Sequence, residues 1–257
     1  MGQVPSSQSV HLETRVEDPT DGCPHGLALI AHGRLGGTFD QPQIRVLAEY
    51  LRDCRKLRVF TWNARGNGQS EGGNEWTDLG VWMGEAGVND YNRMLGDSMT
   101  KFREDFPQVN KPQLFICGYS AGAIFAGCAR PPLALVPVFA PAHYILLSYP
   151  VELNPVIGLH KSGSYFRSVE ALVQGDGWEN LPPEFDGKEP EVNGVLTIMG
   201  GREKVLSYDT WTGILESKNK RGVLSQVVVD GAGHNWEGMT DRIVQEADKW
   251  LASINSA

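Results

Sequence analysis

Short apolar runs alternate with longer segments of helical periodicity along most of the chain. Each run is continuous and largely apolar, as is typical of strands buried on both faces of a parallel sheet. The six runs are Leu27 to Ala31, Leu57 to Trp62, Gln113 to Cys117, Tyr144 to Ser148, Gly194 to Met199 and Ser225 to Val229. Helices are expected at about 41–54, 88–105, 121–129, 165–173, 208–218 and 240–253, and an amphipathic strand at 9–16. This alternation predicts an α/β fold with a mostly parallel central sheet flanked by helices.

The alternation is interrupted between residues 150 and 193, where prolines and scattered glycines replace the regular pattern. Proline removes a backbone donor, so this composition does not suit a central strand. The segment is also longer than most connections, and long loops in compact domains are typically functional or mobile. We expect a small lid-like insertion carrying the 165–173 helix, within a single domain spanning residues 1–257. A surface excursion without a role is the alternative that the sequence leaves open.

The bulk composition narrows the range of partners. The chain has 257 residues, of which 41% are hydrophobic and 21% charged, which is ordinary for a globular protein. Its formal net charge is −8, whereas nucleic acids and anionic membrane surfaces attract basic proteins. The N-terminal residues lack the apolar core of a secretory signal, and no apolar run reaches the length of a membrane span. We therefore expect a cytoplasmic protein with a small-molecule partner, and neither nucleic acid nor a membrane as partner.

The four cysteines predict neither a disulfide framework nor a zinc site. Cys23, Cys54, Cys117 and Cys128 form no CxxC pair, and no Cys/His cluster has the spacing of metal ligands. Cys117 lies in an apolar run and is expected to be a small buried hydrophobe. No metal site is expected.

The strongest chemical motif is Gly118-Tyr119-Ser120-Ala121-Gly122. It follows an apolar run and precedes a helix-like stretch, which is the strand–turn–helix context of a nucleophile elbow. Small residues beside the serine allow the chain to turn sharply. The N–H groups at the start of the helix then point to the place where an oxyanion would form. Ser120 is therefore the candidate nucleophile.

A glycine-rich loop after the last apolar run contains the candidate base, His234. The loop reads Asp230 to Trp236 and comes directly after three valines. A histidine at the carboxyl end of a parallel strand can reach a nucleophile at the end of a neighbouring strand. A lone histidine is more often structural, so this assignment depends on the serine motif and on an acid between them in the chain.

The acid is expected in the loop that follows Val195 to Met199. Glu203 is the carboxylate within reach of that strand end, where it could hold the imidazole tautomer and stabilise the imidazolium. Asp209 is the next candidate, although an acidic residue in the first turn of a helix is also favoured by the helix dipole. Asp176 and Asp230 stay open as further alternatives.

The oxyanion hole is expected in the turn His32-Gly33-Arg34-Leu35, which follows the first apolar run. The predicted donors are the backbone N–H of Arg34 or Leu35, together with that of Ala121. Such donors stabilise the developing negative charge in acyl transfer. A phosphate-binding loop is the rival interpretation, but the spacing matches neither GxGxxG nor a P-loop.

Residues around these motifs are candidates for substrate binding. Trp62, Trp178 and Trp236 stand at a strand end, in the insertion and close to the histidine. Buried aromatic residues are more often core, but an aromatic pocket would favour an apolar or aromatic acyl substrate. The candidates for substrate binding are His32, Leu35, Tyr119, Trp62, Trp178 and Trp236.

The segment Asn63 to Ser70 resembles the D-x-R-G-x-G-x-S turn of the α/β-hydrolase superfamily, with Asn63 where Asp is usual. Together with the three motifs, in the order serine, acid, histidine, it extends the resemblance from about residue 25 to 253. The segments 145–150, 200–203 and 231–234 are similar to a group of small, nearly capless intracellular hydrolases of fungal type. That group is related to dienelactone-hydrolase-like proteins.

The resemblance implies a serine hydrolase with Ser120 as nucleophile, His234 as base and Glu203 as acid. The usual acid in that group is Asp, so a glutamate here departs from the pattern. The implied reaction is acyl transfer on an ester, thioester or lactone through an acyl-enzyme, without a metal or organic cofactor. Two alternatives remain on the same fold: a non-hydrolytic enzyme, such as a lyase, acyltransferase or cyclase, and a non-catalytic ligand receptor.

Overall fold

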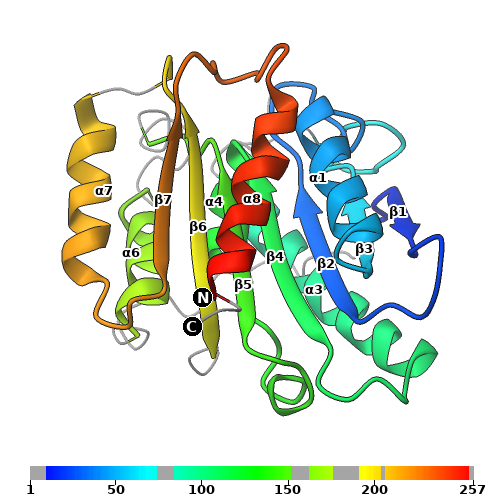
Figure 1. Ribbon diagram of the computed structural model, residues 1–257. Coiled ribbons are helices and arrows are strands. Elements are labelled where there is room, and N and C mark those ends of the chain that lie inside the picture. The colour runs from blue at the N-terminus through cyan, green and yellow to red at the C-terminus, as the bar shows by residue number, and fades with distance from the viewer. Residues whose placement is uncertain (1–9, 74–83, 152–161, 176–190, 204–205, 255–257) are drawn as a thin grey trace, which may run out of the picture.

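The structure is a computed structural model that describes residues 10–73, 84–151, 162–175, 191–203 and 206–254. Seven strands form one sheet in the order β1-β3-β2-β4-β5-β6-β7 (Figure 1). Only β1 runs antiparallel to its neighbour, and the other pairs are parallel. The strands are β1 Thr14–Glu17, β2 Gly26–Ala31, β3 Leu57–Trp62, β4 Gln113–Tyr119, β5 Ala142–Leu147, β6 Val192–Gly200 and β7 Leu224–Val229. The predicted mostly parallel sheet is confirmed, and the strand expected at 9–16 is shortened to β1.

Helices cover both faces of the sheet. Helices α1 (Pro42–Asp53) and α8 (Thr240–Ile254) pack on one face, in front in Figure 1. The other face is covered by α3 Glu85–Asp105, α4 Ala121–Cys128, α6 Ser162–Gln174 and α7 Leu206–Lys218. Each helix expected from the sequence is present, with bounds shifted by at most three residues. A short 3₁₀ helix, η1 Val136–Val138, was not expected.

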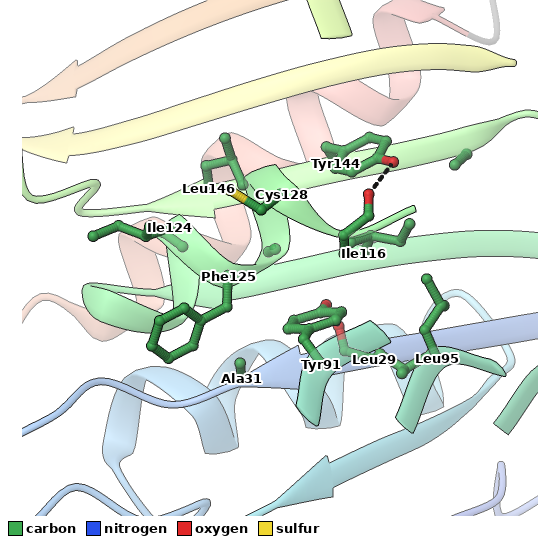
Figure 2. Close-up of a cluster of buried hydrophobic side chains, with 14 of the residues drawn as sticks. Leu29, Ala31, Tyr91, Leu95, Ile116, Ile124, Phe125, Cys128, Tyr144 and Leu146 are labelled. Atoms are coloured by element: carbon green, nitrogen blue, oxygen red, sulfur yellow. Dashed lines mark hydrogen bonds between the residues drawn. The ribbon is translucent and has the colours of Figure 1, made fainter. Parts of the chain in front are cut away.

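Strand β2 shows why the apolar runs are continuous. Leu27 and Leu29 point into the core under α3 and α4, whereas Ala28 and Ile30 point into the core under α1 and α8. Each fully buried leucine or isoleucine side chain contributes roughly 2 kcal/mol relative to an exposed one. Figure 2 shows part of the first core, in which β2, β4 and β5 contribute side chains that meet those of α3 and α4.

Helix α6 is the described helix of the predicted insertion. Val169 and Leu172 are fully buried in the core that α6 shares with α4. A Cβ on Gly127 would lie only 2.7 Å from Val169, so the two helices approach closely. The helix expected within the insertion is therefore present and packs beside α4. Residues 152–161 and 176–190 of the predicted insertion lie outside the described residues.

The carboxyl ends of the parallel strands meet at one edge of the sheet. Ala31 pairs with Gly118, Tyr119 with Leu147, and Gly200 with Val229. The chain crosses from β3 over β2 to β4, and such a reversal of strand order is where α/β sheets typically hold ligands. The candidate residues for chemistry lie in the loops at this edge.

Candidate active site

Ser120 occupies a strained turn between β4 and α4. Its backbone has φ 54° and ψ −122°, a conformation that side-chain-bearing residues rarely adopt. The flanking glycines are required by contact: a Cβ on Gly118 would lie 2.0 Å from the Gly122 carbonyl oxygen, and a Cβ on Gly122 would lie 2.3 Å from the Ala31 oxygen. The turn is anchored by the Ser120 N–H, which donates to the Leu147 carbonyl at 2.9 Å. The serine side chain is thus held at the edge of the sheet.

His234 lies beside this serine. Its Nε2 is 3.0 Å from Ser120 Oγ, and its Nδ1 is hydrogen-bonded to Glu203 Oε2. A carboxylate can only accept, so Nδ1 carries the proton and the bare Nε2 accepts from the Ser120 hydroxyl. This tautomer suits a general base acting on the serine.

Two hydrogen bonds fix the backbone of the histidine loop. The Tyr119 hydroxyl donates to the His234 carbonyl at 2.9 Å, and the Gln43 side-chain amide donates to the Asn235 carbonyl. Burial, reinforced by the Glu203 charge, raises the pKa of Tyr119, so the phenol stays protonated and keeps its donor. Tyr119 is itself almost fully buried, so its side chain supports the histidine loop from the interior of the protein rather than lining an open pocket.

Glu203 is the carboxylate that reaches the histidine. It lies in the turn after β6, and its Oε1 accepts hydrogen bonds from the Gly200 N–H and the Ser148 hydroxyl, each at 2.7 Å. Asp209 lies in the first turn of α7 with an exposed side chain. Asp230 is an exposed residue at the end of β7, and Asp176 lies outside the described residues. Of the four carboxylates weighed from the sequence, the structure brings Glu203 to His234.

The turn after β2 is shaped by His32, which is buried. His32 Nε2 accepts from the Ala64 N–H at 2.8 Å, and Nδ1 lies 2.6 Å from the Gly33 carbonyl oxygen. These contacts set the tautomer: Nδ1 carries the proton and donates to Gly33. The His32 side chain therefore supports the turn, and it also lines a small hollow beside it.

The backbone of this turn faces the start of α4. A Cβ on Gly33 would lie 3.1 Å from Ser120 Cβ, which shows how closely the turn approaches the serine. Leu35 has a positive φ of 62° and a side chain that is 65% exposed. Ala121 is the first residue of α4, so its N–H belongs to the first turn, which has no acceptor within the helix. Arg34 follows Gly33 in this turn and Ala121 follows Ser120, so both positions expected to form the oxyanion hole lie in segments next to the serine.

A small hollow adjoins this turn. Arg34 and Phe125 line it, with the Arg34 guanidinium carbon 5.4 Å from the ring centroid. Arg65 also lines it and makes a two-point hydrogen bond to the buried Asp90, at 2.7 and 2.9 Å.

The segment from Asn63 to Ser70 is a structural turn, as expected, since the Ser70 hydroxyl donates to the Asn63 carbonyl at 2.6 Å.

Solved structures with this architecture are similar to the chain over nearly its whole length. An alpha-beta serine hydrolase homologue from Coxiella burnetii is 18% identical, with a TM-score of 0.60, over 95% of this chain and 97% of that one. XC6422 from Xanthomonas campestris, an α/β serine hydrolase without a lid, is 14% identical, with a TM-score of 0.58, over 98% and 97%. The chain has the α/β-hydrolase fold. Est1E from Butyrivibrio proteoclasticus, solved with ferulic acid, is 14% identical, with a TM-score of 0.61, over 98% of both chains. No protein-family model and no curated protein matches the sequence.

Within this α/β-hydrolase fold, two of the tryptophans predicted to line a pocket are core residues. Trp62 is buried and packs edge-on against Tyr91, with ring centroids 5.0 Å apart. Trp236 is fully buried under α8, although it is only two residues from His234. Both side chains point into the layers rather than outward from the strand edge. Trp178 lies outside the described residues. The aromatic pocket inferred from the sequence therefore loses two of its three tryptophans.

Ser148, at the carboxyl edge of the sheet, is a residue of the site that the sequence motifs did not indicate. It comes directly after β5, has a positive φ of 49° and is fully buried. Its hydroxyl contacts both Glu203 and the indole N–H of Trp236. A small polar residue at the end of a central strand was the available signal, but nothing in the sequence links positions 148, 203 and 236.

Two features are absent from the described part of the chain. No group of three or more His, Cys, Asp or Glu side chains there could hold a metal ion. None of the helices that the structure describes combines the length and the apolar character needed to cross a membrane.

Proposed function

We propose that this protein is a serine hydrolase that cleaves an ester, thioester or lactone of a small molecule. The observation that carries the proposal is the continuous hydrogen-bonded chain from Ser120 Oγ through His234 to Glu203. The three residues come from loops after three strands of one sheet, as a shared reaction centre requires. The solved neighbours support the same class, since they include a serine hydrolase homologue and Est1E with ferulic acid bound.

The proposed reaction follows from the geometry. His234 Nε2 takes the proton of the Ser120 hydroxyl as Oγ attacks the carbonyl carbon. The backbone N–H groups of Arg34 and Ala121 stabilise the oxyanion, and loss of one such donor typically costs about 3 kcal/mol of transition-state stabilisation. The leaving alcohol, thiol or ring oxygen takes the proton from the imidazolium, and water then resolves the acyl-enzyme by the same steps in reverse.

Intact mass after incubation with a small fluorophosphonate tests this function. The wild type is expected to gain one adduct, formed as Ser120 Oγ displaces fluoride from phosphorus. The adduct should be absent from Ser120→Ala and form slowly in His234→Ala. A folded wild type that gains no adduct would contradict serine hydrolysis and favour a non-hydrolytic enzyme or a receptor on this fold.

The acid is tested in the same assay with a matched pair of variants. Glu203→Ala removes the carboxylate that faces His234, and the labelling rate is expected to fall by about 10³-fold or more, as for other triads that lose their acid. Asp209→Ala removes the other carboxylate favoured by the sequence and should label at the wild-type rate. The reverse pattern would assign the acid to α7. A screen of esters, thioesters and lactones follows once labelling is established.

A further inference from the structure

Ser148 supports the carboxylate of Glu203 from the strand between the nucleophile and the acid. Strand β5 lies between β4 and β6, so Ser148 follows the central one of three neighbouring strands. Its N–H continues the ladder by donating to the Ile198 carbonyl at 2.7 Å. Its hydroxyl donates to Glu203 Oε1 at 2.7 Å, on the carboxylate oxygen that does not face His234. The two oxygens of Glu203 therefore have separate tasks.

Trp236 determines which way the Ser148 hydroxyl points. The indole Nε1–H donates to Ser148 Oγ at 2.9 Å, and both side chains are fully buried. A hydroxyl has one proton, so an oxygen that accepts from Trp236 is left to donate toward Glu203. Trp236 holds this position with a φ of 56°, which is unfavourable for a large side chain and persists only where the surroundings enforce it.

The loop after β7 thus contacts Glu203 twice. His234 binds Glu203 directly, and Trp236, two residues later, binds it through Ser148. Backbone contacts join the two loops as well, since the Arg202 N–H donates to the Ala232 carbonyl at 2.9 Å. Buried hydrogen-bond networks of this kind orient a functional group when every member is satisfied.

We infer that Trp236 and Ser148 are positioning residues that hold the Glu203 carboxylate against His234, an inference that rests on the proposed function. The hydrogen bonds from Trp236 to Ser148 and from Ser148 to Glu203, here called the relay, explain how a glutamate can serve as the acid in this turn. Its longer side chain is fixed at Oε1 by Ser148 and by the Gly200 N–H, which leaves Oε2 for the imidazole. Neither residue touches the reacting atoms, so their loss should change the rate of the chemical step and leave probe binding unchanged.

The test measures the maximal phosphonylation rate and the half-saturating fluorophosphonate concentration in Trp236→Phe and Ser148→Ala. Ser148→Ala removes a hydrogen bond to a charged group and should lower the maximal rate by about tenfold or more, whereas Trp236→Phe removes the neutral bond that orients Ser148 and should lower it by about fivefold. The half-saturating concentration should not change. In a Glu203→Ala background, Trp236→Phe should have no further effect.

Matched controls separate the relay from packing. Trp250→Phe removes the indole N–H of another tryptophan in the same core, whose Nε1 has no partner among the described residues. Ser98→Ala removes a buried hydroxyl that donates to the Met94 carbonyl within α3. Both controls should label within twofold of the wild type. The relay is overturned if Trp236→Phe labels like Trp250→Phe, or if its loss persists in the Glu203→Ala background.

A proton NMR measurement keeps this inference separate from the proposed function. The proton between His234 Nδ1 and Glu203 should give a downfield resonance in the wild type, identified by its absence from His234→Ala. Trp236→Phe should shift or broaden it, and Trp250→Phe should not. If the wild type gains no adduct, the proposed function fails, and this resonance alone decides whether Trp236 positions the carboxylate. An unchanged resonance in Trp236→Phe would overturn the relay.

Discussion

The two ends of helix α4 face opposite requirements. At the first end, Ser120 has a positive φ and presents its hydroxyl to His234 at the edge of the sheet. At the other end, the Arg130 guanidinium is buried and donates to the carbonyl oxygens of Gly127, Ala129 and Ser168. Both arrangements suit the helix dipole, which favours negative charge at the start and positive charge at the end. The first end holds a strained backbone at the proposed nucleophile, whereas the second holds a buried charge.

The burial of Arg130 shows what the second end requires. The side chain is only 8% exposed, and desolvation lowers the pKa of Arg130. The contacts of the guanidinium include these carbonyl groups and the Ser168 hydroxyl, which is 2.7 Å away. Because these acceptors come from α4, the turn after it and α6, the cation joins the two helices. Such a buried cation is difficult to replace, because its acceptors are left without donors when it is removed.

The largest effect on stability is expected from Arg130→Met, which tests whether the second end of α4 has a structural role alone. The substitution keeps an apolar stem but leaves buried carbonyl groups without a donor, so unfolding free energy should fall by about 3 kcal/mol. Denaturant unfolding measures the loss, and fluorophosphonate labelling of the folded variant should stay within twofold of the wild type. Arg15→Met removes a partly exposed arginine that pairs with Asp40 and lies over the Phe39 ring, and it should lower stability by at most about 1 kcal/mol. A clearly lower labelling rate in folded Arg130→Met would show that the second end of α4 also affects the reactivity of Ser120.

A second contrast separates the two ends of the sheet, where two histidines lie in different surroundings. His234 is partly exposed at the carboxyl edge, whereas His143 is buried near the start of β5. The His143 ring stacks on Phe115 with centroids 4.7 Å apart and meets Trp250 edge-on. Burial, helped by the Arg55 charge, lowers the pKa of His143 to about 4. Its Nε2 lies 3.1 Å from the Asn193 amide nitrogen.

This burial predicts a pH dependence of stability. In the unfolded chain His143 binds a proton at about pH 6.5, and in the folded chain only at about pH 4. The unfolded state therefore takes up more protons between these values, and stability falls as the pH is lowered through this window. From pH 8 to pH 5 the contribution of His143 should be a loss of about 2 kcal/mol. The measurement is the unfolding free energy of wild type minus that of His143→Phe at each pH. A difference that does not vary with pH would show that the pKa of His143 is the same in the folded and unfolded states.

The sequence predicted the layers and the strand ends more fully than the contacts between them. Periodicity located every strand of the parallel sheet, because runs such as 27–31 are buried on both faces. The glycines at 118 and 122 indicated the sharp turn at Ser120, because neighbouring backbone leaves no room for a Cβ at either position. The choice between Glu203 and Asp209 stayed open, because a difference of six residues does not tell which carboxylate faces the loop after β7. Trp62 and Trp236 are core residues, because a position near a strand end or near His234 does not tell into which layer a side chain packs.

The smallest effect is expected from Ser120→Gly, which tests whether the first end of α4 stores strain. Glycine adopts a positive φ without penalty, whereas alanine keeps the Cβ and the strain. Ser120→Gly and Ser120→Ala both lack the nucleophile, so neither should be labelled. Their difference in unfolding free energy therefore reports the backbone alone. Relief of strain outweighs the extra freedom of an unfolded glycine, and Ser120→Gly should be the more stable variant by about 1 kcal/mol. Should Ser120→Ala be as stable as Ser120→Gly, the φ of 54° would cost nothing in this turn. The contrast between the ends of α4 would then lie in charge rather than in strain.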